Sequence, residues 1–274
     1  MKLSVSSRIA EGFLSKEEAI MTLPEFCDLA VGAGYKSICM RASQIGIKTP
    51  AEEVARGARL IQDKGLEVTM ISGDFDIVYN NMQGPRCLHN ISPYLDLAEQ
   101  LGAKLIRICI KTEDDIQAAK KAADEAAERH LSLVHQCHVQ SMFETVDQIE
   151  NCLRSMDRPN LGLIYEAANL EECRQGYGRN CIQRLAPWIK NVYLQNQKVK
   201  SDGAITLDTW THGPISFDIM GIVEPGGVDF AEIFTGLKQV GYDGIITVHQ
   251  SAPEDGSSPM QAAADTASFL RSLM

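Results

Sequence analysis

The chain has 274 residues, of which 45% are hydrophobic and 23% charged, and a formal net charge of −10. This composition is that of a folded globular protein, and the acidic balance excludes nucleic acid as the expected partner. No apolar run approaches the roughly 18 residues that a membrane span requires, and the N-terminal residues lack a signal-peptide pattern. We therefore expect a cytoplasmic protein with no membrane partner.

Short β-branched runs alternate with helical patterns eight times along the chain, which is typical of repeated βα units. The predicted strands are 3–6, 36–40, 66–71, 105–110, 131–137, 161–165, 189–194 and 244–248. The predicted helices cover about 23–31, 50–64, 93–101, 112–129, 143–155, 181–186, 229–240 and 259–273. Pro50 opens the second helix, and Gly65 and Gly102 follow the ends of the second and third, as helix-terminus preferences lead us to expect.

Eight strand–helix pairs in this length predict an α/β fold, a single-domain (β/α)₈ TIM barrel over residues 1–274. The alternative is an open, doubly wound sheet, which usually carries a glycine-rich phosphate loop after its first strand. Here the first strand is followed by Ser6-Ser7-Arg8-Ile9-Ala10, without such a loop. The barrel is therefore favoured.

One connection is much longer than the others and covers residues 198–227. It contains Trp210 and His212, and four glycines follow Gly203 within it. Long connections in compact domains are usually active-site lids or binding loops. We predict that this segment is a lid or a specificity insertion.

Polar residues gather where the later strands end, which is where barrel enzymes place their catalytic groups. They are Arg107 and Lys111 after the fourth strand, Gln136 and His138 after the fifth, Glu166 and Asn169 after the sixth, Tyr193, Gln195 and Asn196 after the seventh, and His249 after the eighth. Because side chains alternate along a strand, Arg107 and Lys111 share a side, as do Gln136 and His138. His135 and His138 cannot both point inward, and the alternation favours His138 as the site residue.

Each of these residues also has a purely structural interpretation. Glu166 could be a rim carboxylate paired to a lysine, and His249 a core histidine with its hydrogen bonds satisfied. Tyr193 could simply fill the barrel. Arg107 and Lys111 could bind a phosphate or carboxylate, or be rim charges. The sequence favours function for Glu166 and His249 and leaves the other three open.

At these strand ends the chain resembles the xylose isomerase-like sugar isomerase and epimerase superfamily. The resemblance covers nearly the whole length and is carried by Gly34-Tyr35, by Gly162 to Glu166 with Asn169, and most specifically by 226–230, 237–244 and 246–248. It implies a sugar or keto-sugar substrate.

The resemblance also implies a divalent metal, held in family members by a Glu, an Asp, a His and a second Glu from strands five to eight. By position these fall on Gln136, Glu166, Tyr193 and His249, and a further family histidine falls on Asn169, so the chain departs at every position. We take Gln195 as the substitute ligand on the seventh strand, which gives the metal set Gln136, Glu166, Gln195 and His249. One carboxylate favours Mn²⁺ or Zn²⁺ over Mg²⁺, and loss of the metal remains an alternative.

The resulting hypothesis is a sugar or keto-sugar isomerase or epimerase that stabilises an enediolate with the metal. His249 or His138 would act as base and Glu166 as ligand or acid. The substrate contacts would be Arg107, Lys111, Asn169, Tyr193 and Asn196. Gln136 cannot take up a proton, which keeps open a metal-assisted lyase acting by β-elimination, or a non-catalytic sugar-binding subunit. A DNA-cleaving relative is disfavoured by the charge, and a homodimer or homotetramer is expected.

Overall fold

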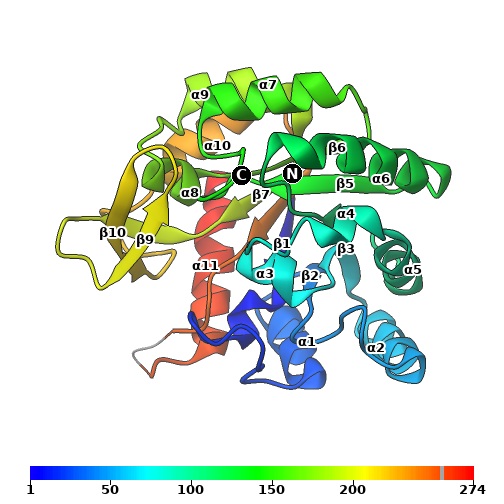
Figure 1. Cartoon of the computed structure of the whole chain (residues 1–274). Helices are drawn as coiled ribbons and strands as arrows, with labels where there is room; N and C mark the ends of the chain where they lie inside the picture. The colour runs from blue at the N-terminus through cyan, green and yellow to red at the C-terminus, as the bar shows by residue number, and fades with distance from the viewer. Residues whose placement is uncertain (254–255) are drawn as a thin grey trace.

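The computed structural model describes residues 1–253 and 256–274, and within these ranges the chain forms a closed parallel barrel flanked by helices (Figure 1). Its strands are β1 (Lys2–Ser6), β2 (Ser37–Arg41), β3 (Glu67–Ser72), β4 (Leu105–Arg107), β5 (Ser132–Gln136), β6 (Leu161–Glu166), β7 (Ile189–Leu194) and β11 (Ile245–Val248). Neighbouring strands follow chain order, and β1 closes the ring against β11, with Lys2 opposite Ile245. The single-domain TIM barrel predicted from the sequence is confirmed.

The helices that surround the barrel also lie where the sequence predicts them. They are α1 (Leu23–Gly32), α2 (Ala51–Asp63), α5 (Ser92–Leu101), α6 (Ile116–Glu128), α7 (Val146–Met156), α9 (Arg179–Leu185), α10 (Phe230–Gln239) and α11 (Pro259–Leu273). Short elements not predicted are α3 (Phe75–Tyr79), α4 (Arg86–His89), α8 (Ala167–Glu172) and the 3-10 helices η1 (Ser7–Ala10), η2 (Glu113–Asp115) and η3 (Ala186–Trp188). No helix in the described part of the chain is both long and apolar enough to cross a bilayer.

Local capping explains several of these boundaries. Thr22 accepts a hydrogen bond from the backbone of Glu25, whose side chain accepts from the backbone of Thr22 in return, so that α1 begins with a capping box. Thr145 and Gln148 do the same for α7. Gly102 ends α5 with a φ of 72°, a left-handed conformation that glycine adopts without strain.

The inside of the barrel is filled by side chains and forms no pore. The fully or nearly buried residues of this inner layer are Cys39, Met70, Leu105, Val134, Ile164 and Tyr193, one from each of β2 to β7. A second, larger apolar core lies between the strands and the surrounding helices. Because the interior is closed, a ligand can enter only at the ends of the strands.

The long segment 198–227 is mostly not a loop. With the preceding residues it forms an antiparallel sheet of β8 (Asn196–Val199), β9 (Ile205–Thr209) and β10 (Gly213–Met220), which stands beside the barrel in Figure 1. Glu144, fully buried after β5, holds it in place. Its carboxylate accepts hydrogen bonds from the backbone N–H groups of Trp210 at 2.7 Å and Thr211 at 2.8 Å. The segment therefore forms a wall at the barrel mouth in this structure.

Candidate active site

A cavity of about 210 Å³ opens at the carboxyl ends of the barrel strands. Ligand pockets commonly measure roughly 300–1,000 Å³, so this one suits a molecule no larger than a small sugar. Six of the residues predicted from the sequence line it: Arg107, Gln136, His138, Asn169, Gln195 and His249. Leu207 and Phe217 of the antiparallel sheet complete one wall.

Two residues predicted to contact substrate are engaged elsewhere and do not line the cavity. The Lys111 amine donates to the backbone oxygen of Gln140 at 2.6 Å. Strand β4 ends at Arg107, so the alternation that placed Lys111 beside Arg107 does not extend to it. The Asn196 amide donates to the backbone oxygens of Gly221 and Glu224, at 2.7 and 3.0 Å. Asn196 thus ties the antiparallel sheet to the turn that follows it.

His249 lines the cavity, whereas Tyr193, also predicted to contact substrate, is not among the lining residues. Their rings stack at 3.9 Å, and Tyr193 is fully buried beneath the cavity. His249 Nδ1 lies 3.2 Å from the Ser6 hydroxyl, and Nε2 lies 3.5 Å from a guanidinium nitrogen of Arg41. Burial, and then the charge of Arg41, lower the pKa of His249 well below its ordinary value. His249 is therefore a neutral imidazole that resists protonation, which argues against the predicted base role.

His138 is oriented by Asn80. The Asn80 amide donates to His138 Nδ1 at 2.9 Å and to the backbone oxygen of Val139 at 3.0 Å. Asn80 has a φ of 51°, in the left-handed region where asparagine is tolerated. Burial, and then the charge of Arg107, lower the pKa of His138 well below its ordinary value. Nδ1 also lies 3.0 Å from the Val139 backbone oxygen, so its role depends on the tautomer. When Nδ1 accepts from Asn80, the ring proton is on Nε2, and the neutral ring can donate a hydrogen bond from there.

Glu166 ends β6 and is 1% exposed, behind the cavity wall. One of its oxygens accepts hydrogen bonds from the amides of Gln136 and of Asn169, the latter at 2.6 Å. Burial raises the pKa of Glu166 to about 7. The two amides, which do line the cavity, separate the carboxylate from it. Glu166 therefore orients Gln136 and Asn169.

The sequence analysis missed Glu172, which lines the cavity and is 3% exposed. Burial, and then the charge of Glu166, raise the pKa of Glu172 to about 8, so its carboxyl group is mainly protonated at neutral pH. It lies on the short helix α8, which the sequence does not signal. The spacing Glu166, Asn169, Glu172 places polar groups three residues apart, and such spacing repeats on one helix face. This spacing in the sequence could have identified Glu172 as a neighbour of Glu166 and Asn169.

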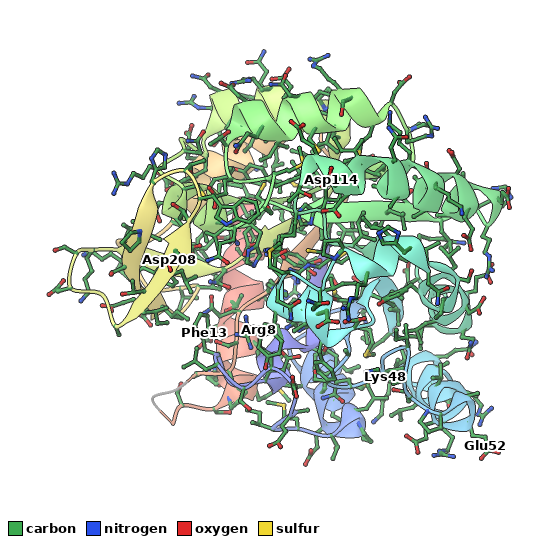
Figure 2. All side chains as sticks on the ribbon, viewed as in Figure 1. Arg8, Phe13, Lys48, Glu52, Asp114 and Asp208 are labelled. Atoms are coloured by element: carbon green, nitrogen blue, oxygen red, sulfur yellow. The ribbon has the colours of Figure 1, made fainter. Side chains whose placement is uncertain are left out.

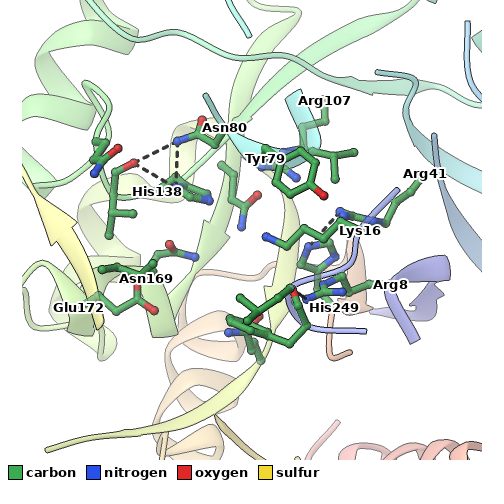
Figure 3. Close-up of a pocket in the computed structure, with 18 of the residues that line it drawn as sticks. Arg8, Lys16, Arg41, Tyr79, Asn80, Arg107, His138, Asn169, Glu172 and His249 are labelled. Atoms are coloured by element: carbon green, nitrogen blue, oxygen red, sulfur yellow. Dashed lines mark hydrogen bonds between the residues drawn. The ribbon is translucent and has the colours of Figure 1, made fainter. Parts of the chain in front are cut away.

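Three cations were also missed because the ends of the first two strands were not considered. Arg8 follows β1, Arg41 is the last residue of β2, and Lys16 lies in the connection before α1. All three line the cavity, and Figure 3 shows the Lys16 amine directed toward its middle. The buried Glu11 carboxylate pairs with Arg41 at 2.9 Å and with Arg8 at 3.3 Å.

Lys16 differs from an ordinary surface lysine. Burial, and then the charges of Arg8 and Arg41, lower the pKa of Lys16 to about 7. Its amine lies 5.7 Å from the centre of the Phe13 ring and 5.6 Å from that of Tyr79. At neutral pH a large fraction of Lys16 is therefore unprotonated and able to accept a proton.

Comparison with known proteins assigns the chain to a family. The sequence profile described as "Xylose isomerase-like TIM barrel" matches residues 27–273. The chain belongs to this family. The resemblance noted at the strand ends is thereby confirmed.

Individual members of the family are distant in sequence. An inosose dehydratase from Geobacillus thermodenitrificans is 18% identical over 157 residues, which are 57% of this chain and about half, 52%, of that protein. The structure of D-allulose 3-epimerase from Methylomonas sp. in complex with D-allulose superposes with a TM-score of 0.71, at 16% identity, over 100% of this chain and 97% of the other. These identities establish a shared fold and leave the reaction open.

A divalent metal is bound in one member, the xylose isomerase-like barrel protein from Mycobacterium smegmatis in complex with magnesium (TM-score 0.68, 14% identity, 100% and 95% coverage). The corresponding residues of this chain do not fit such an ion. No cluster of three or more His, Cys, Asp or Glu side chains suited to a metal occurs within residues 1–253 and 256–274. His249 directs Nε2 at Arg41, and Gln136 directs its amide nitrogen at Glu166. Within the predicted ligand set, Gln136 Oε1 and Glu166 Oε1 are the buried oxygens without a partner among the described residues, and two such oxygens are too few for Mg²⁺ or Zn²⁺.

Proposed function

We propose that this family member transfers a proton at the carbon beside the carbonyl group of a small sugar derivative, so that it isomerises or epimerises that sugar. One observation carries the proposal: Lys16 and Glu172 face the same small cavity, and the pKa values of both are shifted close to neutrality, to about 7 and about 8. Near neutral pH the cavity therefore contains both an amine that can take a proton and a carboxyl group that can give one.

The neighbouring residues supply the remaining parts of this reaction. The Lys16 amine removes the proton, and the negative charge moves to the carbonyl oxygen. The Nε2–H group of His138 donates to that oxygen, as a neutral imidazole does when its pKa is lowered. Glu172 then protonates the same carbon from another side, which inverts it. Alternatively, Lys16 returns its proton to the former carbonyl carbon while the hydroxyl proton of the first carbon moves to the former carbonyl oxygen, which isomerises the sugar.

A dehydratase is the second candidate, and the state of Glu172 favours it. After the same first step, the protonated carboxyl group can donate its proton to a hydroxyl group on the next carbon. That carbon–oxygen bond breaks, its electrons leave with the oxygen as water, and a double bond forms. The matched inosose dehydratase is named for a loss of water of this kind.

The remaining sequence-based expectations stay predictions. A Mn²⁺ or Zn²⁺ cofactor is the least well supported of these predictions. Its ligands would be Gln136, Glu166, Gln195 and His249, but hydrogen bonds direct Gln136 toward Glu166 and His249 toward Arg41, and not toward a shared metal position. A cytoplasmic location, a homodimer or homotetramer, and a lid function for residues 198–227 are likewise untested. Elemental analysis of the purified protein, before and after incubation with Mn²⁺ or Zn²⁺, tests the metal directly.

Deuterium exchange tests the proposed function, because both candidate reactions begin with removal of a carbon-bound proton. The protein is incubated in D₂O with a panel of neutral sugars, keto-sugars, sugar acids and sugar phosphates, and products are analysed by NMR and mass spectrometry. Exchange with an isomeric product indicates isomerase or epimerase, and exchange with loss of water indicates dehydratase. No exchange with any compound would contradict the proposal.

A further inference from the structure

Arg107 is a buried charge in the cavity that has no ion pair among the described residues. It is the last residue of β4, lines the cavity and is 2% exposed. In the described part of the chain its Nε has no hydrogen-bond partner, and no carboxylate forms an ion pair with it; Glu166 acts on it only through its charge, without contact. A buried charge without a partner is costly, since it gives up hydration for nothing in return. Such a residue is usually kept for what it binds.

Arg41 is a second buried guanidinium group with a nitrogen atom that has no hydrogen-bond partner among the described residues. Its Nε donates to Glu11, but its Nη2 is buried without a hydrogen-bond partner among the described residues. The two guanidinium groups are close enough to act on each other, since the charge of Arg41 contributes to lowering the pKa of Arg107. The Glu11 carboxylate is shared between Arg41 and Arg8. One carboxylate therefore serves two guanidinium groups, and Arg107 adds a third.

We infer that Arg107 and Arg41 bind an anionic group of the substrate, a carboxylate or a phosphate, so that this protein takes acidic sugar derivatives. The inference rests on the proposed function and specifies its substrate class. Guanidinium groups suit both anions, because their N–H donors match two oxygens at once. The same residues explain why the site disfavours a metal ion, since a second positive charge beside them would be repelled.

The rest of the cavity fits the remainder of such a molecule. In Figure 3, Arg107 and Arg41 lie on one side, whereas Asn169 and Glu172 lie on the other, with the Lys16 amine between them. Asn169 offers an amide that can bind hydroxyl groups. A substrate anion near Lys16 also stabilises the ammonium group that forms when Lys16 takes a proton. Anion binding and proton removal therefore support each other.

The inference is tested with pairs of ligands in which one member is neutral and the other carries a carboxylate or phosphate group at one end. The pairs are D-glucitol with D-gluconate, galactitol with D-galactonate, D-mannitol with D-mannonate, and D-glucose with D-glucose 6-phosphate. Dissociation constants are measured by titration calorimetry at low and high salt. A charge-assisted hydrogen bond contributes about 1.5–3 kcal/mol, so the charged member of at least one pair should bind roughly 10–100-fold more tightly. Preference in the acid pairs identifies a carboxylate, and preference only in the last pair identifies a phosphate.

The matched variants are Arg107→Gln and Arg59→Gln. Arg59 lies exposed on α2, outside the cavity, and its replacement should change nothing. Arg107→Gln should bring the two members of each pair to within about threefold of each other, an affinity ratio worth well under 1 kcal/mol. It should also raise the unfolding temperature of the ligand-free protein, because it removes an unpaired buried charge.

Two results would overturn the inference. The first is equal affinity for both members of every pair, or equal failure of all to bind. The second is an Arg107→Gln protein that unfolds at a lower temperature and keeps the preference for charged ligands, because Arg107 would then have a structural role. Binding is measured without turnover, so it is separable from the proposed reaction. If the protein prefers anions but catalyses no deuterium exchange, the anion site is supported and the proposed reaction is contradicted.

Discussion

The two halves of the barrel mouth differ sharply in chemistry. The half formed after β1 to β4 carries the cations Arg8, Lys16, Arg41 and Arg107. The half formed after β5 to β7 carries the amides Gln136, Asn169 and Gln195 and the carboxyl group of Glu172. One side is thus suited to a negative charge and the other to hydroxyl groups and protons. An unsymmetrical site of this kind fixes the direction of a molecule that is acidic at one end.

Lys16 provides the largest test of this division, because it is the cation we assign to proton removal. Lys16→Met should reduce both deuterium exchange and turnover by about 10²–10⁴-fold, the usual contribution of a general base. Lys48→Met is the matched control, since Lys48 lies exposed at the periphery of the molecule, well apart from Arg8 in Figure 2. Exchange rates are followed by NMR. If the exchange rate of Lys16→Met is unchanged, Lys16 is not the base, and the base lies in the opposite half of the site.

Glu172 tests the other half. Glu172→Gln keeps the shape but cannot deliver a proton, so turnover should fall about 10²-fold. Deuterium exchange by Lys16 should persist within a few-fold, a ratio of about 1 kcal/mol or less. The control is Glu52→Gln, on the exposed first turn of α2 (Figure 2). If exchange and turnover fall together, Glu172 is not the acid, and proton removal and proton donation are not assigned to separate halves of the site.

The pH profile of kcat/KM should report both halves at once. Below about 7 the Lys16 amine becomes protonated and cannot take a proton, so the rate should fall as pH falls. Above about 8 Glu172 becomes ionised and cannot give a proton, so the rate should fall as pH rises. Each limb should approach a tenfold change per pH unit. Lys16→Met should lose the acid limb and Glu172→Gln the alkaline limb, and persistence of both limbs in both variants would show that other groups titrate.

The smallest expected effect comes from the wall that borders the second half. Glu144→Ala removes the acceptor of the Trp210 and Thr211 N–H groups, which should lower the free energy of unfolding by about 1–3 kcal/mol. KM should rise more than kcat falls, because the wall shapes the cavity without touching the proton-transfer groups. Chemical denaturation with Glu52→Ala as control measures the stability change. A lower kcat at unchanged KM would contradict a purely shaping role.

Most of the fold follows from the sequence. The alternation of strand and helix patterns and the glycine stops predict the barrel and its principal helices within a few residues, because each element buries its own apolar face. The antiparallel sheet after β7 was taken for a loop. Its strands do alternate apolar and polar residues, in Ile205-Thr206-Leu207-Asp208 and in 215–219, so the sequence carries the period of two that is typical of strands. The length and the glycines of the segment were given more weight than this period.

The site was predictable only in part. Strand ends identify Gln136, His138 and His249, which line the cavity. Alternation along a strand applies only to Gln136, because β5 ends at Gln136 and β11 at Val248, and the two histidines follow those ends. The same reasoning extends to Arg8 and Arg41, yet an arginine after a strand carries no local mark of burial. Pairing with Glu11 and the shifted pKa of Lys16 depend on groups far apart in sequence, which only the folded chain brings together.

The anchoring of the antiparallel sheet has a consequence for how this protein can evolve. The Glu144 carboxylate holds the sheet through the main-chain N–H groups of Trp210 and Thr211, which every residue except proline possesses, and through the Thr211 hydroxyl group. The side chains of Leu207 and Phe217, which face the cavity, take no part in that grip. Substitutions there can resize the pocket while the attachment stays intact. Substitutions in the sheet can therefore change the substrate preference, while the barrel and the residues that we propose for proton transfer stay the same.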